Sequence, residues 1–168
     1  MQRRLRARSF TFATLIVLAA LAGCASGTDA ASTTTPPPAS NPATETYAAS
    51  LGVNIASMTK INDNLYIKDI TVGSGVVVLA NHSTTVVYTG WLTNGTQFDS
   101  DVGKTPLLSF VFGTGAVIPG WDQGMLGMRV GGTRLIVVGS TLGYGANGLG
   151  AIPPSATLVF NVQVTSVQ

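Results

Sequence analysis

Short runs of alternating apolar and polar residues fill the chain from about residue 63 to residue 168. The runs are rich in β-branched and aromatic residues and are bounded by glycine, which is typical of β-strands. Gly73-Ser74-Gly75 closes the first run, and Asn94-Gly95 after the second is a hairpin-type turn. The pattern predicts five strands, at residues 65–71, 84–88, 107–112, 133–138 and 157–167.

A single stretch in this part of the chain has a helical period. Ile118, Trp121, Met125 and Met128 recur at spacings of three, four and three residues, and Pro119 suits the first turn of a helix. One short helix against an antiparallel sheet is an α+β architecture. We therefore predict an α+β domain over residues 63–168.

The first 24 residues follow another pattern. Four arginines occur among the first eight residues, residues 10–22 are apolar apart from two threonines, and small residues precede Cys24. The apolar run is shorter than the roughly 20 residues that a membrane-spanning helix needs. Residues 1–23 are therefore predicted to be an export signal.

Cys24 is the only cysteine, which excludes an intramolecular disulfide. The sequence Leu21-Ala22-Gly23-Cys24 resembles a lipobox, where bacterial lipoproteins are cleaved and acylated on the cysteine. We expect a lipid anchor on Cys24 and a location in the cell envelope, with the membrane contacted through the anchor only. Ala25 gives no aspartate-type retention signal, which favours the outer membrane if the cell has one, and otherwise the extracellular face. An ordinary signal followed by an incidental cysteine is the alternative.

Two accessory segments separate the signal from the domain. Residues 24–46 are mainly alanine, serine, threonine and proline, with too little apolar surface to offset their ordering entropy, and are predicted to be a disordered tether. Residues 47–62 are predicted to be an arm that packs on the domain, with more tether as the alternative, because Gly52 disfavours a helix. The apolar residues of this arm recur at near-helical spacing: Tyr47, Leu51, Ile55 and Met58.

Charge and chemistry exclude several classes of protein. Four of the nine basic residues lie in the signal, which leaves five against seven acidic residues, so a basic footprint for nucleic acid is missing.

His82, the only histidine, lies in a polar stretch that we interpret as a solvated loop, and it lacks the partners of a catalytic triad or zinc site. Residues 113–115 resemble the start of a dinucleotide-binding loop, but the third glycine of that motif and a βαβ unit are both missing. Asp99 and Asp101 alternate sides of an extended segment, which disfavours a carboxylate dyad. We expect no cofactor and no metal.

Three segments combine aromatic and turn residues. Taken singly, each is explained by packing in a core. Their order and spacing resemble the FKBP family of peptidyl-prolyl cis-trans isomerases over residues 65–167. The matching motifs are Tyr88-Thr89-Gly90 with Phe98-Asp99-Ser100, then Val117-Ile118-Pro119-Gly120-Trp121, then Tyr144-Gly145 with Ile152-Pro153-Pro154 and the strand to Phe160.

The resemblance implies a twisted antiparallel sheet wrapped around one short helix, with an apolar cavity between them. It implies Trp121 as the floor of the cavity, Asp99 and Tyr144 as polar groups at its sides, and the Ile118 N–H and the Tyr144 hydroxyl as donors to a bound peptide. The implied walls are Tyr88, Phe98, Val117, Ile118, Ile152 and Phe160.

Three positions depart from the family pattern. Leu108 stands where the family usually has an aromatic residue, which loosens one wall. The loop at residues 146–150 is one residue shorter than in the best-known members. Lys104 stands where an arginine often pairs with the aspartate, so an ion pair with Asp99 would lose its bidentate geometry.

The expected function is acceleration of rotation about Xaa–Pro bonds of exported proteins by a monomer. Its partners would be proline-containing polypeptides, with tacrolimus-type macrolides as inhibitors. Because the planar amide is more charge-separated than the twisted one, an apolar cavity lowers the rotation barrier, which is about 18–20 kcal/mol in water. A non-catalytic peptide-binding or chaperone lipoprotein with the same fold is the alternative that Leu108 and the short loop support. A purely structural envelope lipoprotein is the third reading.

Overall fold

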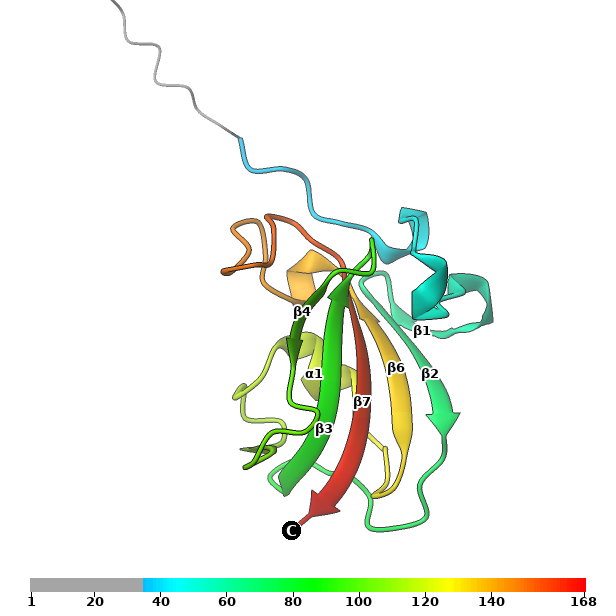
Figure 1. Cartoon of the computed structure of the whole chain (residues 1–168), viewed down its shortest axis with the longest axis vertical. Coiled ribbons are helices and arrows are strands. Elements are labelled where there is room, and N and C mark those ends of the chain that lie inside the picture. The colour runs from blue at the N-terminus through cyan, green and yellow to red at the C-terminus, as the bar shows by residue number, and fades with distance from the viewer. Residues whose placement is uncertain (1–34) are drawn as a thin grey trace, which may run out of the picture. The chain divides into compact units, whose positions relative to one another are not determined.

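In the computed structural model, which describes residues 35–168, strand β3 (Ser83–Leu92) organises the fold. The sheet is antiparallel, with the strand order β1-β2-β6-β7-β3-β4, and β5 pairs with the first half of β3 (Figure 1). The other strands are β1 (Thr59–Asn62), β2 (Leu65–Thr71), β4 (Gln97–Ser100), β5 (Leu108–Val111), β6 (Thr133–Val138) and β7 (Leu158–Val167).

The predicted α+β class, a twisted antiparallel sheet around one short helix, is confirmed. Strands β2 and β6 have the predicted bounds, and β3 is longer than its predicted core of 84–88. The sequence pattern missed β1 and β4, which have four residues each. The predicted signal peptide, Cys24 and the first part of the predicted tether lie outside the described residues.

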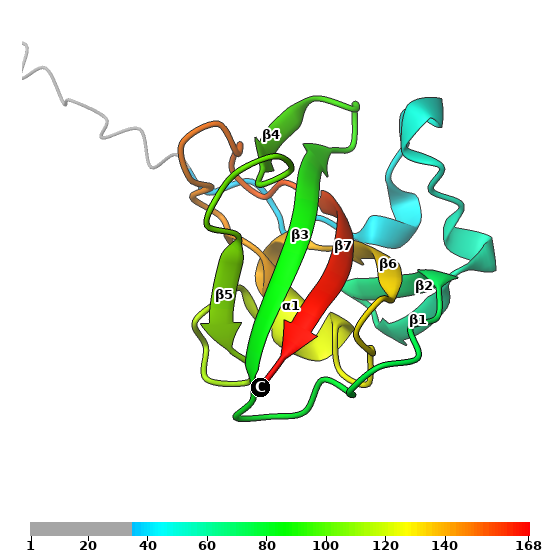
Figure 2. The same ribbon diagram turned by 60° about the horizontal axis from the view of Figure 1, so that its bottom comes forward.

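One edge of β3 is shared by two short strands. Figure 2 shows β5 and β4 beside the two ends of β3, and between them the chain leaves the sheet. β5 pairs with residues 83–86, and β4 pairs with residues 89–91. The break therefore falls at Val87 and Tyr88, in the middle of the strand.

The helix α1 (Pro119–Gly124) begins with proline, as predicted, but is only six residues long. The predicted helical period through Met128 does not continue as a helix, because the chain turns at Gly127, whose φ is +76°. Met125 and Met128 are nevertheless buried in the core. The buried Arg134 of β6 donates to the carbonyls of Gly124 and Leu126, at 2.8 and 3.3 Å, and so fixes the end of α1.

The sheet has an inner face, which packs on α1, and an outer face. Successive residues of β7 alternate between them, since Val159 joins the outer cluster and Phe160 the inner core. The outer cluster consists of Met58, Tyr66, Leu135, Val137 and Val159. The arm at residues 47–62 packs on it through Tyr47, Leu51, Val53 and Ile55, and it forms short 3-10 turns at Ala49–Leu51 and Ile55–Ser57 before β1.

Residues 40–46 differ from the predicted disordered tether, because the structure places them against the domain. A 3-10 turn spans Pro42–Thr44, and Pro42 is buried. The absence of a side chain at Gly139 lets the proline approach, since a Cβ there would lie 3.1 Å from Pro42 Cδ. Composition alone does not reveal such contacts, because they are hydrogen bonds and one proline rather than an apolar run.

Candidate functional site

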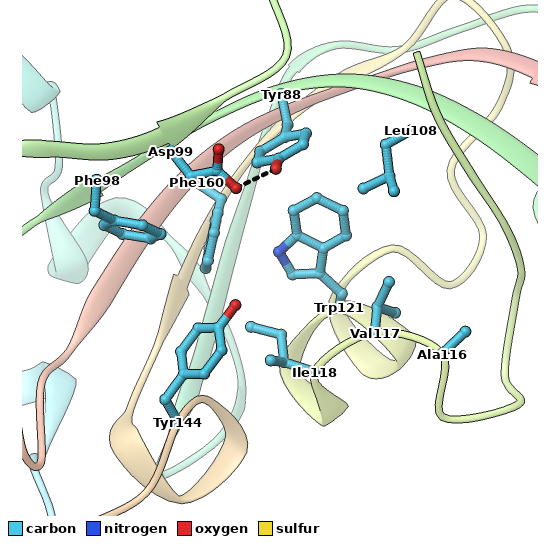
Figure 3. A pocket seen from close by; sticks show the side chains of 10 residues that line it. All are labelled: Tyr88, Phe98, Asp99, Leu108, Ala116, Val117, Ile118, Trp121, Tyr144 and Phe160. Carbon is cyan, nitrogen blue, oxygen red and sulfur yellow. Dashed lines mark hydrogen bonds between the residues drawn. The ribbon is translucent and has the colours of Figure 1, made fainter. Parts of the chain in front are cut away.

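A cavity of about 200 Å³ opens between β3, β4, β5 and α1 (Figure 3). This volume is below the range of about 300–1,000 Å³ that is usual for drug-sized ligands. It therefore suits one ring of a larger ligand or peptide. The lining residues are Tyr88, Phe98, Asp99, Leu108, Ala116, Val117, Ile118, Trp121, Tyr144 and Phe160.

Trp121 lies deep in the cavity, with a side chain that is 3 % exposed. Its ring meets Tyr88 and Phe160 edge to face, at centroid distances of 5.1 and 5.3 Å. Its indole nitrogen is buried and has no partner among the described residues. Edge-to-face packing fixes ring orientation and adds about 0.5–1.5 kcal/mol per pair beyond burial. The indole is therefore a rigid surface.

Gly90 allows two walls of the cavity to meet. Phe98 and Phe160 pack edge to face at 5.6 Å. A Cβ at Gly90 would lie 2.7 Å from Phe98 Cζ and 3.0 Å from Phe160 Cε1. The glycine of the Tyr88-Thr89-Gly90 motif is thus needed for close packing of the aromatic rings over β3.

Asp99 is the carboxylate of the cavity lining. The Tyr88 hydroxyl donates a hydrogen bond to its Oδ2, and the Ser100 N–H donates to its Oδ1 at 2.8 Å. Lys104 Nζ lies 3.8 Å from Oδ1 as a single, exposed contact, in keeping with the expected loss of bidentate geometry. Asp99 is therefore held in place chiefly by neutral donors.

The hydroxyl of Tyr144 points into the cavity from the loop after β6 (Figure 3). Burial and then the nearby charge of Asp99 raise the pKa of Tyr144. Burial and then the hydrogen bond to Asp99 raise the pKa of Tyr88. Both phenols therefore stay neutral near pH 7, but only Tyr144 presents its proton to the cavity, since Tyr88 donates to Asp99.

Ile118 immediately precedes α1 in extended conformation. Within residues 35–168, no carbonyl accepts a hydrogen bond from its N–H. The carboxylate of Asp122 in α1 accepts from the N–H groups of Gly113 and Gly115, at 3.0 and 3.2 Å. It thereby closes the loop that carries Ala116 and Val117. The two glycines that resemble part of a dinucleotide-binding loop in the sequence thus serve to close this loop.

Asp101 supports the site, although no sequence motif points to it beyond its disfavoured pairing with Asp99. Its side chain is buried and accepts from the N–H of Tyr88 at 2.6 Å and from that of Leu108 at 3.2 Å. It thereby replaces the missing strand partner at the break between β4 and β5. Two cavity residues depend on this one carboxylate for their backbone positions.

The structure brings nine of the ten predicted peptide-site residues to this cavity. Ile152 is the exception, because it is buried in the inner core beside the cavity and does not line it. Ala116 lines the cavity and was not predicted, since alanine carries no sequence signal. His82 is only half-exposed, and its Nδ1 is buried, which differs from the solvated loop residue expected from its polar neighbours.

The arrangement offers an apolar hollow, directional donors and one engaged carboxylate. Across residues 35–168, the acidic, histidine and cysteine side chains form no cluster of three or more that could hold a metal ion. In the same part of the chain, no helix is both long and apolar enough to cross a bilayer.

Comparison with known proteins bears on this site directly. Residues 77–165 match the family described as FKBP-type peptidyl-prolyl cis-trans isomerase. The chain is 46 % identical over 104 residues to an FK506-binding protein of Neisseria meningitidis serogroup B, covering 61 % of this chain and 95 % of that protein. It is 49 % identical over 83 residues to the peptidyl-prolyl cis-trans isomerase FKBP15-1 of Arabidopsis thaliana, covering 49 % and 54 %.

The fold has counterparts among solved structures. The crystal structure of FkpA from Escherichia coli superposes with a TM-score of 0.61 and 32 % identity, covering 66 % of this chain and 51 % of that one. The similarity therefore covers the domain and about half of that protein.

Proposed function

The chain belongs to the family of FKBP-type peptidyl-prolyl cis-trans isomerases, and we propose that its cavity accelerates rotation about Xaa–Pro bonds by removing the bond from water. The barrier in water is the loss of amide resonance. Water stabilises the charge-separated planar amide more than the twisted one, so removal of water favours the twisted transition state. Each 1.4 kcal/mol or so gained in this way is a tenfold rate increase.

The observation that carries this proposal is the buried aromatic floor. Trp121, edge to face with Tyr88 and Phe160, offers a flat surface on which a proline ring can lie. The one carboxylate of the lining accepts a hydrogen bond from Tyr88, and the lining residues include no serine, cysteine, lysine or histidine to serve as a strong nucleophile. Rotation about a bond needs none.

The polar groups would act on the peptide carbonyls. The Ile118 N–H and the Tyr144 hydroxyl would each donate to a carbonyl of the bound peptide, which fixes the chain on one side of the rotating bond. Asp99 would hold the Tyr88 ring through their hydrogen bond. Its negative charge would stabilise the charge distribution of the twisted amide relative to that of the planar amide. The walls Phe98, Leu108, Val117 and Phe160 would exclude water.

A protease-coupled assay with a proline tetrapeptide tests this function on the full-length chain in detergent. We expect acceleration at micromolar enzyme and inhibition by a macrolide of the FK506 type, the ligand for which the relatives are named. Tyr144→Phe and Asp99→Ala each lower kcat/KM by roughly three- to tenfold, since each removes one hydrogen-bonding group. Asp63→Ala is the control, because Asp63 is exposed in the turn between β1 and β2.

Two results would overturn the proposal. If isomerisation proceeds at the uncatalysed rate in the presence of the wild-type chain, the proposed activity is wrong. Peptide binding without acceleration would favour a binding module instead. Wild-type rates in both Tyr144→Phe and Asp99→Ala would remove the assigned roles while leaving the activity in place.

We also propose that the enzyme acts on exported proteins from a lipid anchor on Cys24 in the cell envelope. The support is the export-signal pattern and the lipobox-like Leu21-Ala22-Gly23-Cys24. Proline-limited folding steps take about 10–100 s, so a catalyst outside the cytoplasm would serve proteins that fold there. Metabolic labelling with a radioactive fatty acid tests the anchor, and label that survives Cys24→Ala would refute it.

A further inference from the structure

The segment just before the arm contacts the loop that carries Tyr144. In Figure 1 the blue trace at the start of the described chain runs past the orange loops that follow β6. Ser40 and Ser140, one hundred residues apart, form two reciprocal hydrogen bonds. The Ser40 N–H donates to Ser140 Oγ at 3.0 Å, and the Ser140 N–H donates to Ser40 Oγ at 2.8 Å.

Ser140 is the base of the Tyr144 loop. It begins the 3-10 turn Ser140–Leu142 and is 2 % exposed. Its carbonyl accepts from the N–H groups of Gly143 and Gly145, at 3.1 and 2.8 Å, so it holds the residues on both sides of Tyr144. A shift of Ser140 would move this tyrosine.

A second bond ties the same segment to the far side of the loop. The Ser155 hydroxyl donates to the carbonyl of Pro37 at 2.8 Å, and the Ser155 N–H donates to the carbonyl of Gly145 at 3.0 Å. Ser155 has a φ of +54°, which is unusual for a residue other than glycine and needs such support. Tyr144 therefore lies between two anchor points that are both bonded to residues 37–40.

The segment itself is fixed by its own contacts. The Asn41 side chain caps the turn Pro42–Thr44, Pro42 is buried against Gly139, and the Tyr47 hydroxyl donates to the Pro42 carbonyl at 2.8 Å. The bonds to Ser140 and Ser155 thus come from an ordered strap of residues 37–47 rather than from a loose chain end.

We propose that Ser40 is a positioning residue of the isomerase, which holds the Tyr144 hydroxyl at its place in the cavity through Ser140. The inference rests on the proposed role of Tyr144 in peptide binding. A donor that is already oriented needs no ordering when substrate binds, so misplacement of the loop lowers kcat/KM without removing a group from the site. The strap would thereby make the last part of the predicted tether a part of the active enzyme.

A double-mutant cycle on the full-length chain in detergent tests this role. We expect Ser40→Ala to lower kcat/KM for a proline tetrapeptide by about two- to fourfold, a part of what one hydrogen bond contributes. In a Tyr144→Phe background the same substitution has no further effect, because the hydroxyl to be positioned is gone. Ser50→Ala, at an exposed serine of the arm outside this contact, retains wild-type kcat/KM.

Two outcomes would overturn the positioning role: wild-type activity in Ser40→Ala, or the same loss with and without the Tyr144 hydroxyl. Thermal unfolding of each variant shows whether it is folded. If Ser40→Ala does not fold, the cycle is repeated with Ser155→Ala, which removes the bond to Pro37. The wild-type and Tyr144→Phe rates test the proposed function separately, so a failure of the strap is distinguishable from a failure of the site.

Discussion

The two faces of the sheet use the same alternation of side chains for different ends. On the outer face, Val137 and Val159 are covered by the arm, and their packing is complete. On the inner face, Phe160 and its neighbours pack on Trp121 but leave a hollow between them. The difference arises because rigid rings that meet edge to face cannot collapse into the remaining space as flexible aliphatic side chains do. An isomerase site of this kind is a defect in packing that the surrounding rings keep open.

Substitution of the two tryptophans, one on each face, is expected to give the largest difference between the faces. Trp121→Ala is expected to lower the free energy of unfolding by about 3–5 kcal/mol, because it opens a cavity in a core position, and to abolish isomerase activity. Trp91, a partly exposed residue of β3 on the other face, is the matched control. Urea unfolding and the protease-coupled assay measure the two effects.

Trp91→Ala should keep kcat/KM within twofold of the wild type. If Trp91→Ala lost activity as Trp121→Ala does, the outer face would take part in catalysis and the distinction between the faces would be lost. Full activity in Trp121→Ala would instead remove the aromatic floor from the mechanism.

Leu108 tests how open the hollow needs to be. Leu108→Phe restores the aromatic residue usual in the resembling family and adds roughly 40 Å² of apolar surface, worth about 1 kcal/mol. We expect an FK506-type macrolide to bind about fivefold more tightly, as measured by titration of Trp121 fluorescence. Val111→Phe, at an exposed position of the same strand, is the control and leaves the affinity unchanged. Weaker binding by Leu108→Phe would mean that the new ring occupies the cavity itself.

The contrast also explains what the sequence could predict. Strand β2 follows from its alternating apolar and polar residues, and β6 from a continuous apolar run that glycines bound, because both patterns are long enough to read. The residues of the cavity could be predicted only through the resemblance to the FKBP family, whose motifs are local runs that can be matched residue by residue, such as Tyr88-Thr89-Gly90. Within such a run the backbone fixes which side chains point inward.

The supporting contacts could not be predicted. Asp101 acts at a break in the pairing of β3, and Ser40 acts on a residue one hundred positions away, so neither role exists until the sheet is formed. The end of α1 is also a tertiary effect, because Arg134 of β6 donates hydrogen bonds to the carbonyls of Gly124, the last residue of the helix, and Leu126. Polar residues in a low-complexity segment give no signal of a partner so far along the chain.

Alkaline pH offers the finest comparison of the faces, through one tyrosine on each. Burial is the main cause that raises the pKa of Tyr47 in the arm, followed by the charge of Glu45, and burial likewise raises that of Tyr88 in the cavity. A phenol whose pKa is higher in the folded chain than the usual value of about 10 stabilises the fold fully below that pH. This stability is lost as pH rises above about 10 toward the folded pKa.

We therefore expect the free energy of unfolding, measured in urea from pH 8 to 11, to fall above about pH 10. The fall is shallower in Tyr47→Phe and in Tyr88→Phe, and the two reductions add in the double variant, because the side chains lie on opposite faces. Only Tyr88→Phe also changes macrolide affinity at pH 8, since its hydroxyl holds Asp99 in the cavity. Parallel curves for wild type and both variants would show that neither phenol is kept neutral by the fold, and an affinity change in Tyr47→Phe would join the two faces in one function.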